Sequence, residues 1–279
     1  MTKEFTPEQS LLGRATEYRS NYAPELLFPI LRQQKRDELG IASGALPFVG
    51  EDLWNAYEIS WLNLRGKPQV ALGVFRIPAT SPYLIESKSL KLYLNSFNQT
   101  GFADVVAVRE CVRRDLSAAA GASVAVEIHS LDEQPIRHYA YPNGACVDGL
   151  DVEINCYQPT PALLRTVSGH EVEDELLYSH LLKSNCLVTG QPDWGTVMIR
   201  YSGAALDREA LLRYVVSFRE HNEFHEQCVE RIYTDIMAQC APRKLAVWAR
   251  YTRRGGLDIN PFRASEAGWG PDNVFEVRQ

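Results

Sequence analysis

The stretch LKLYLNSF, residues 90–97, recurs as LLRYVVSF at residues 211–218. A leucine, a tyrosine, a serine and a phenylalanine occupy the same four places in both copies. At the same spacing, VAV at residues 124–126 falls on LAV at residues 245–247. Similarity at a fixed period indicates that one supersecondary unit is used twice. The sequence therefore predicts two modules that share a fold.

Both copies have the same predicted order of elements: a strand, a turn with glycine and proline, a strand, two helices and a strand. Alternating apolar residues indicate the strands, and apolar residues four apart from Phe224 to Ile236 indicate a helix packed on a sheet. Asn222 is a suitable N-cap for this helix. The expected strands lie near 56–63, 69–77 and 122–131, then 150–157, 195–202 and 243–252, and the expected helices lie near 88–98 and 103–119, then 206–221 and 223–239.

The predicted fold class is α+β, with two modules that each pair a small antiparallel sheet with two helices on one face. Residues 132–149 are rich in proline, glycine and polar residues and are expected to link the modules. The N-terminal module is expected at residues 1–135 and the C-terminal module at residues 136–279. Because sheet edges need a partner, we expect modules to associate within a chain and between chains.

Composition narrows the class of protein. The 29 basic and 35 acidic residues give a net charge of −6, which argues against a surface that coats nucleic acid. No stretch approaches the roughly 18 apolar residues of a membrane span, and the N-terminal MTKEFTPEQS lacks the apolar run of a signal peptide. The six cysteines include no Cys-x-x-Cys pair, so free thiols are expected. We expect a cytoplasmic protein.

The segment SNCLVTGQPDWG, residues 184–195, places a thiol and a carboxylate at the two ends of a tight loop. When the repeat is extended through the turn of each copy, Cys186 aligns with Leu62 and Asp193 aligns with Gln69. Only the second copy carries both reactive groups. Cys186 is therefore either a small buried apolar residue or a nucleophile whose proton transfers involve Asp193.

The segment ESKSLKLY opens the first predicted helix pair with Glu86, Ser87, Lys88 and Ser89. One interpretation is an ordinary capped helix start. The other is a phosphate site, because helix N–H groups, hydroxyls and a lysine attract anions. The second copy has DREALLRY at this place, without the serine-lysine pattern. We therefore expect the phosphate-type site in the first copy and the nucleophile in the second.

The segment EFHEQC begins the last predicted helix. Phe224, His225 and Glu226 are either ordinary first-turn residues with the phenyl ring in the core or the wall of a heterocycle pocket. A phenyl face stacks on a flat base, and a carboxylate accepts from ring N–H groups. A third alternative is a metal held by His225 together with His221 and Cys228, which the lack of a further Cys/His pair in the sequence disfavours.

The segment YTRRGGLDINP, residues 251–261, follows the last predicted strand. Arg253 and Arg254 beside Gly255 and Gly256 suit a phosphate, because a guanidinium matches phosphate oxygens and glycine lets backbone N–H groups approach. An ordinary Gly-Gly turn beside exposed arginines is the alternative. The sequence contains neither GxGxxG nor GxxxxGK[ST], so a Rossmann or P-loop nucleotide site is not supported.

Taken together, ESKSLKLYLNSFN, LLKSNCLVTGQPDWG, FHEQCVERI and YTRRGGLDINP closely resemble the NADPH-dependent 7-cyano-7-deazaguanine (preQ0) reductases of queuosine biosynthesis. The resemblance covers roughly residues 20–279, and the two-copy layout resembles the long, bimodular branch of that family. It implies tandem tunnelling-fold (T-fold) modules, active sites at module interfaces and a homodimer. It also implies reduction of the nitrile of the small molecule preQ0 to the aminomethyl group of preQ1, with two NADPH consumed.

The resemblance also implies roles for individual residues. Cys186 is implied as the nucleophile that forms a covalent thioimide, and Asp193 as the proton donor. No metal, membrane or direct nucleic-acid contact is implied. Substrate binding is implied for Glu86, Ser87, Lys88, Phe224, His225 and Glu226, and NADPH binding for Lys88, Ser89, Arg254 and Gly255.

Two other functions compete with this one. The first is a zinc-dependent enzyme of the pterin or GTP cyclohydrolase type with the same fold, which would need a zinc site built from Cys and His. The second is a non-enzymatic pair of modules that binds a purine-like ligand or RNA. The division of motifs between the copies and the acidic net charge argue against the second.

Overall fold

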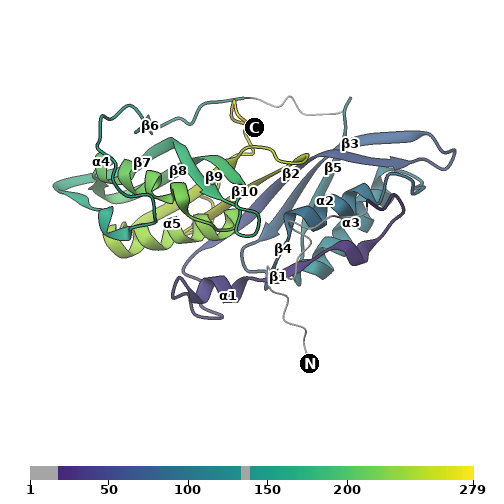
Figure 1. The fold of residues 1–279 in the computed structure, drawn as a ribbon, viewed down its shortest axis with the longest axis horizontal. Coiled ribbons are helices and arrows are strands. Elements are labelled where there is room, and N and C mark those ends of the chain that lie inside the picture. Colours follow the sequence, from purple (N-terminus) through teal and green to yellow (C-terminus); the bar gives the residue numbers. More distant parts are fainter. Residues whose placement is uncertain (1–17, 133–138) are drawn as a thin grey trace. The chain divides into compact units, whose positions relative to one another are not determined.

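The computed structural model describes residues 18–132 and 139–279 and is drawn in Figure 1. The predicted boundary between residues 135 and 136 lies outside the described residues. The chain forms two compact units, each assembled from separate segments. Among the described residues, unit 1 comprises 18–38, 51–132 and 253–259, and unit 2 comprises 39–50, 139–252 and 260–279.

Unit 1 combines an antiparallel sheet, in the order β5-β3-β2, with helices α2 and α3. Leu90 and Leu116 of the helices share one buried apolar cluster with Trp54 and Phe75 of the strands. The stretch LKLYLNSF packs into this core, which explains its apolar pattern. The elements are β1 (Pro29–Leu31), α1 (Arg32–Asp37), β2 (Val49–Leu62), β3 (Pro68–Pro78), β4 (Tyr83–Ile85), α2 (Ser87–Asn95), α3 (Val105–Ala120) and β5 (Ala125–Ser130).

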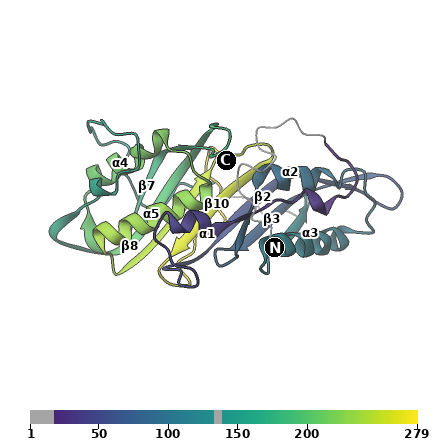
Figure 2. The same ribbon diagram turned by 60° about the horizontal axis from the view of Figure 1, so that its bottom comes forward.

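Unit 2 has strands in the order β10-β9-β8-β7-β6, antiparallel except for the short pair of β6 with β7. Helix α5 runs alongside these strands (Figure 2). Its residues Cys228, Ile232 and Ile236 are fully buried, which confirms the predicted apolar stripe. The elements are β6 (Ala145–Cys146), β7 (Thr166–Asn185), β8 (Pro192–Leu206), α4 (Arg208–Val216), α5 (His225–Cys240), β9 (Lys244–Tyr251) and β10 (Leu257–Ala264).

The first strand of the second copy is not where the sequence predicted it. The described residues 150–157 form no strand, and the strand that pairs with β8 is β7, at Thr166–Asn185. Residues 151–156 do alternate in exposure, but alternation alone makes no strand without a neighbour to complete the hydrogen-bond ladder. The first half of β7 is mostly exposed and charged, so it lacks the alternation that identifies a strand.

Two further expectations are corrected. Helix α5 has Phe224 rather than Asn222 at its N-cap position, because Asn222 forms a backbone bridge with Asn185 and is held outside the helix. The structure also contains strand β10, which the sequence did not predict. Its Pro261 has no N–H to donate to a ladder, so the sequence did not indicate a strand there. In the described part of the chain, no helix is long and apolar enough to cross a lipid bilayer.

The turns of the two copies correspond, with one difference. Strand β2 ends at Leu62, which pairs with Pro68, whereas β7 ends at Asn185, which pairs with Pro192. Asn185 is therefore the structural counterpart of Leu62, and the proposed alignment of Leu62 with Cys186 is wrong by one residue. The second loop is one residue longer, and Cys186 is its first residue.

Helix α4 provides a test of stability. Asp207 caps this helix by accepting from the Ala210 N–H at 3.1 Å and pairs with Arg165 at 2.7 Å. Burial alone would raise the pKa of Asp207, but these contacts outweigh it and lower the pKa. We expect Asp207→Ala to lower the free energy of unfolding by about 1 kcal/mol at neutral pH. Urea unfolding of this variant and of Asp207→Asn, which keeps the cap, checks this.

The sign of the pH dependence follows from the lowered pKa. The Asp207 contribution is complete above the unfolded-state pKa of about 3.9. It is lost as the pH falls through the lower folded-state pKa. The difference between wild type and Asp207→Ala should therefore shrink below about pH 4, and a difference that grows there would contradict the assignment.

Candidate active site

The β7–β8 hairpin holds Cys186 as the first residue of its loop and Asp193 as the second residue of β8. The Cys186 N–H donates to the Gln191 carbonyl at 2.8 Å, and the Gly190 N–H donates to the Cys186 carbonyl at 3.0 Å. Gly190 has φ of +66°, a conformation that glycine adopts without strain. Asp193 lies opposite Ser184 in the ladder. Cys186 and Asp193 are only 5% and 6% exposed, so both lie in an environment that largely excludes water.

The segment before α5 joins this hairpin through the backbone. The Asn185 N–H donates to the His221 carbonyl at 2.8 Å, and the Glu223 N–H donates to the Asn185 carbonyl at 3.0 Å. These bonds place the first turn of α5 beside the hairpin loop. His225 Nε2 consequently lies 3.5 Å from Asp193 Oδ1. The structure thus brings together a carboxylate and an imidazole that are far apart in the sequence.

Tyr251, at the end of β9, is a neighbour that the sequence did not indicate. Its ring centroid lies 3.9 Å from that of His225. Burial, with Cys228 and Asp193 as electrostatic neighbours, raises the pKa of Tyr251 well above its ordinary value, so the phenol stays neutral. Tyr251 pairs with Gly195 of β8, and a Cβ at Gly195 would lie 3.1 Å from the Tyr251 ring. The pairing register could not be deduced from either segment alone.

The remaining residues of EFHEQC occupy different environments. Phe224 is half-buried rather than part of the core, so its ring can form a pocket wall. Glu226 is 4% exposed in the first turn of α5. Glu223 is also buried and makes a bidentate ion pair with Arg231, at 2.6 to 3.1 Å. Glu223 is therefore engaged by a structural ion pair.

The metal alternative at this helix is not supported. Within residues 18–132 and 139–279, one group of Cys, His and acidic side chains has ligand atoms within 4.8 Å of one another, and it is Cys146, Asp148 and His180. His221, His225 and Cys228 do not form such a group. Cys228 is completely buried, and this burial raises the pKa of its thiol, which favours the protonated form over a metal-binding thiolate.

In unit 1, Glu86 caps α2. Its carboxylate accepts from the N–H groups of Lys88 at 2.6 Å and Ser89 at 2.8 Å, and from the Ser87 hydroxyl at 3.4 Å. Burial raises the pKa of Glu86 despite these bonds. The Ser89 hydroxyl donates to the Glu86 carbonyl and accepts from the Phe28 N–H. Two N–H groups of this helix start are thus already bonded to the chain's own carboxylate.

The Gly-Gly turn of unit 1 lies close to α2. The Arg254 N–H donates to the Leu257 carbonyl at 2.8 Å, and Gly255 has φ of +62°. A Cβ at Gly255 would lie 3.0 Å from Lys91 Nζ. Lys91 also lies 3.7 Å from Glu58. The turn therefore brings backbone groups close to the ammonium group of Lys91 in α2. Such a set of donors suits phosphate.

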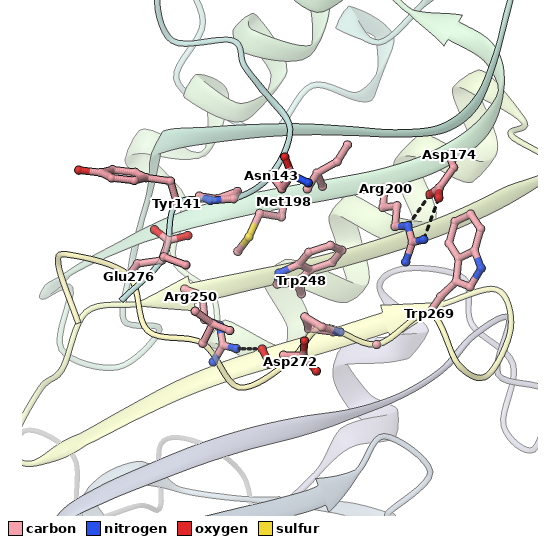
Figure 3. A pocket seen from close by; sticks show the side chains of 16 residues that line it. Tyr141, Asn143, Asp174, Met198, Arg200, Trp248, Arg250, Trp269, Asp272 and Glu276 are labelled. Atoms are coloured by element: carbon pink, nitrogen blue, oxygen red, sulfur yellow. Dashed lines mark hydrogen bonds and ion pairs between the residues drawn. The ribbon is translucent and has the colours of Figure 1, made fainter. Parts of the chain in front are cut away.

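A cavity of about 520 Å³ in unit 2 contains none of the predicted site residues (Figure 3). Its arginines are engaged: Arg200 pairs with Asp174 and lies over the Trp269 ring, and Arg250 donates to the Asp272 carbonyl at 2.7 Å. This cavity is thus separate from the Cys186 loop.

Two family models match the chain. "Nitrile reductase, 7-cyano-7-deazaguanine-reductase N-term" matches residues 18–128, and "QueF-like protein" matches residues 192–268. Full-length relatives named NADPH-dependent 7-cyano-7-deazaguanine reductase support both matches. The one from Azoarcus sp. (strain BH72) is 65% identical over 272 residues, covering 98% of this chain and 96% of the relative.

Two other relatives carry the same name. The protein of Aromatoleum aromaticum is 63% identical over 278 residues, covering 100% of this chain and 98% of the relative. That of Dechloromonas aromatica is 64% identical over 270 residues, covering 97% and 95%. The resemblance inferred from four short segments is therefore confirmed across the chain, which belongs to the family of NADPH-dependent 7-cyano-7-deazaguanine reductases.

Proposed function

We propose that this chain reduces the nitrile of preQ0 to the aminomethyl group of preQ1 with NADPH, in queuosine biosynthesis, through a covalent thioimide on Cys186. The observation that carries this proposal is the hairpin loop, which presents a cysteine and a carboxylate in a dry site with His225 beside the carboxylate. Such a set of groups supports covalent catalysis with proton transfer.

The first step needs only groups of unit 2 and the substrate. As the Cys186 thiol adds to the nitrile, its sulfur forms a bond to the carbon and one C–N π bond breaks. The thiol proton passes to Asp193, which gives a proton to the nitrile nitrogen. The product is a neutral thioimide. Its carbon accepts hydride more readily than a nitrile carbon does, so one hard step is divided into easier ones. The Cys186 thiolate leaves once that carbon has become tetrahedral.

His225 and Tyr251 support the later proton transfers. His225 lies 3.5 Å from the Asp193 carboxylate, so it can return the proton that Asp193 gives up. Tyr251 stays neutral and packs against the imidazole, which holds the ring in place. Phe224 stacks on the deazapurine, and the carboxylates of Glu226 and Glu86, with Ser87 and Lys88, bind its polar edge.

NADPH supplies, when bound, the two hydrides that the reduction requires. Lys88, Ser89, Arg254 and Gly255 would hold it. The positive φ of Gly255, the neighbouring Lys91 and the Arg254 guanidinium fit a phosphate-bearing ligand. The N–H groups at the start of α2 already donate to Glu86. Anion binding is therefore assigned mainly to the side chains of Lys88 and Arg254.

At the level of assembly, we propose tandem T-fold modules at residues 1–135 and 136–279, with a helix pair on one face of each sheet, and a homodimer in the cytoplasm without direct nucleic-acid contact. In support, each unit contains an antiparallel sheet with two longer helices. All six cysteines are free, as is usual in a reducing compartment.

The direct test adds preQ0 to the purified protein with NADPH and follows NADPH oxidation by absorbance. We expect two NADPH oxidised for each preQ0 converted. Binding of preQ0 without NADPH oxidation would favour the non-enzymatic alternative.

Treatment with a chelator separates the proposal from a zinc enzyme. We expect dialysis against EDTA to leave the rate of preQ0 reduction unchanged, because the proposed chemistry uses a thiol, a carboxylate and NADPH. Loss of preQ0 reduction that returns on adding Zn²⁺ would show that the reaction needs a metal and would contradict the proposed chemistry. A mock-dialysed sample is the control.

A further inference from the structure

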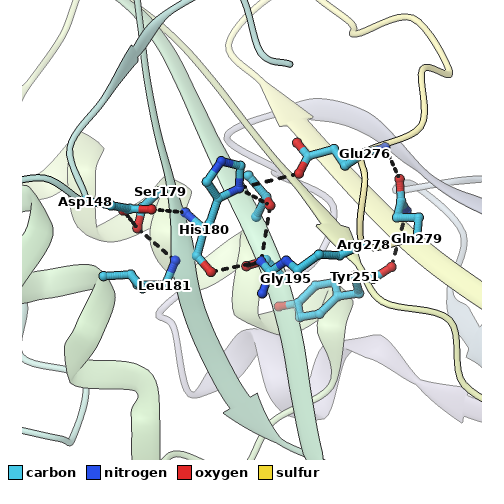
Figure 4. Close-up of polar contacts among 10 residues, drawn as sticks. Asp148, Ser179, His180, Leu181, Gly195, Tyr251, Glu276, Arg278 and Gln279 are labelled. Carbon is cyan, nitrogen blue, oxygen red and sulfur yellow. Dashed lines mark hydrogen bonds and ion pairs between the residues drawn. The ribbon is translucent and has the colours of Figure 1, made fainter. Parts of the chain in front are cut away.

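The last residues of the chain pack against the strand ends that carry the proposed catalytic groups (Figure 4). We infer that Arg278 and Gln279 are positioning residues, which hold the Gly195–Tyr251 pair and through it Asp193 and His225. This inference rests on the proposed function of the Cys186 loop.

Arg278 closes a gap in the β7–β8 ladder. The register of these strands shifts between Ser179 and Leu182, and such a bulge leaves backbone groups without ladder partners. The Arg278 guanidinium donates from Nη2 to the His180 carbonyl at 2.9 Å and to the Gly195 carbonyl at 3.0 Å. One side chain therefore joins the bulged strand to β8 two residues after Asp193.

Two other side chains accept hydrogen bonds from the N–H groups of the bulge. The Asp148 carboxylate accepts from the His180 N–H at 2.8 Å, and the Ser179 hydroxyl accepts from the Leu181 N–H at 3.1 Å. These contacts satisfy the N–H groups of His180 and Leu181, whereas Arg278 binds the carbonyls of His180 in β7 and Gly195 in β8. The geometry near Asp193 thus depends on a donor supplied by the end of the chain.

Gln279 holds the other member of the same cross-strand pair. Its Nε2 donates to the Tyr251 carbonyl at 3.2 Å and to Asn260 Oδ1 at 2.7 Å, while its Oε1 accepts from the Glu276 N–H at 3.2 Å. Gln279 is 6% exposed, so water does not readily replace these bonds. Arg278 and Gln279 consequently fix the backbones of Gly195 and Tyr251 together.

The Gly195–Tyr251 pair, held by Arg278 and Gln279, lies next to the proposed reacting groups. The Tyr251 ring packs closely over the Gly195 backbone, where an added Cβ would lie 3.1 Å from the ring, and it lies against His225. Asp193 is two residues from Gly195 on the same strand. A shift of about 1 Å in reacting groups can cost about 100-fold in rate. Loss of the Arg278 contacts should therefore slow chemistry more than it weakens binding.

The test compares Arg278→Ala and Arg278→Lys with Arg243→Ala. Arg243 is an arginine of the same unit that pairs with Glu171 and Glu173 at the surface. For Arg278→Ala we expect kcat for preQ0 reduction to fall by about 10- to 100-fold, with KM changed by less than about threefold. Lysine should restore part of kcat because its ammonium can donate to one of the carbonyls. Arg243→Ala should resemble wild type.

A second readout does not depend on turnover. Alkylation of Cys186 by iodoacetamide, followed by peptide mass, should be faster in Arg278→Ala, because a loosened hairpin exposes the thiol. The inference is overturned if Arg278→Ala matches Arg243→Ala in both kcat and alkylation rate. It is also overturned if kcat falls only in proportion to the folded fraction, without rescue by lysine. Failure of the proposed function would appear instead as absence of turnover in wild type, with the alkylation comparison still deciding the role of Arg278.

Discussion

We expect Cys186→Ala to abolish preQ0 reduction, with a fall in kcat of more than about 10⁴-fold, because loss of a nucleophile removes the whole covalent route. Without the sulfur, hydride would have to add to an unactivated nitrile carbon. The variant should also fail to form the 1:1 adduct with preQ0 that intact-protein mass spectrometry should detect in wild type without NADPH. Steady-state NADPH oxidation and the adduct mass are the two measurements.

Cys156 is the matched control for this experiment. It lies in the same unit, and hydrogen bonds with Thr160 and Gln158 lower the pKa of its thiol. A lowered pKa makes Cys156 a reactive thiol by local chemistry, yet it lies outside the hairpin loop. Cys156→Ala should retain both turnover and the adduct. Turnover by Cys186→Ala, or an adduct that maps to Cys156, would refute the covalent role of Cys186.

The second large effect is expected at Asp193. Asp193→Asn keeps the size of the side chain but removes the acid, so we expect kcat to fall by about 10²- to 10⁴-fold. The dissociation constant for preQ0 should change by less than about threefold if Asp193 acts mainly on the proton in the transition state. Asp193→Ala should lose at least as much turnover. Rapid-quench or steady-state kinetics and calorimetric titration measure the two quantities separately.

Asp174→Asn provides the comparison for Asp193. Asp174 belongs to the same unit, has a largely exposed side chain and pairs with Arg200 beside the cavity of Figure 3. Its replacement should leave kcat close to the wild-type value. Equal losses in turnover and binding for Asp193→Asn would make Asp193 a substrate-binding residue instead of the proton donor.

Much of the fold followed from local patterns. Helices α3 and α5 were predicted within a few residues, because an apolar stripe of period near four survives in any context that buries one face. The hairpin turns were predicted because glycine and proline restrict the backbone locally. The 150–157 segment failed as a strand because the identity of a ladder partner is not a local property.

In the candidate site, too, local sequence indicated some residues and not others. Cys186 and Asp193 were identified from the sequence because they sit at two ends of one short loop. Tyr251, Gly195 and Arg278 were not identified as parts of the site. They join it through strand pairing and through the return of the chain end, and no local spacing encodes either contact.

The sequence by itself determined the repeat, most of the elements and the reactive residue types, since each depends on neighbours within a few positions. Only the tertiary structure decided that Cys186 begins a loop one residue longer than its counterpart. It alone placed His225 beside Asp193 and Tyr251 against His225. The reason is physical: pairing register and the packing of distant strands depend on the free energy of the whole sheet, which no single segment contains.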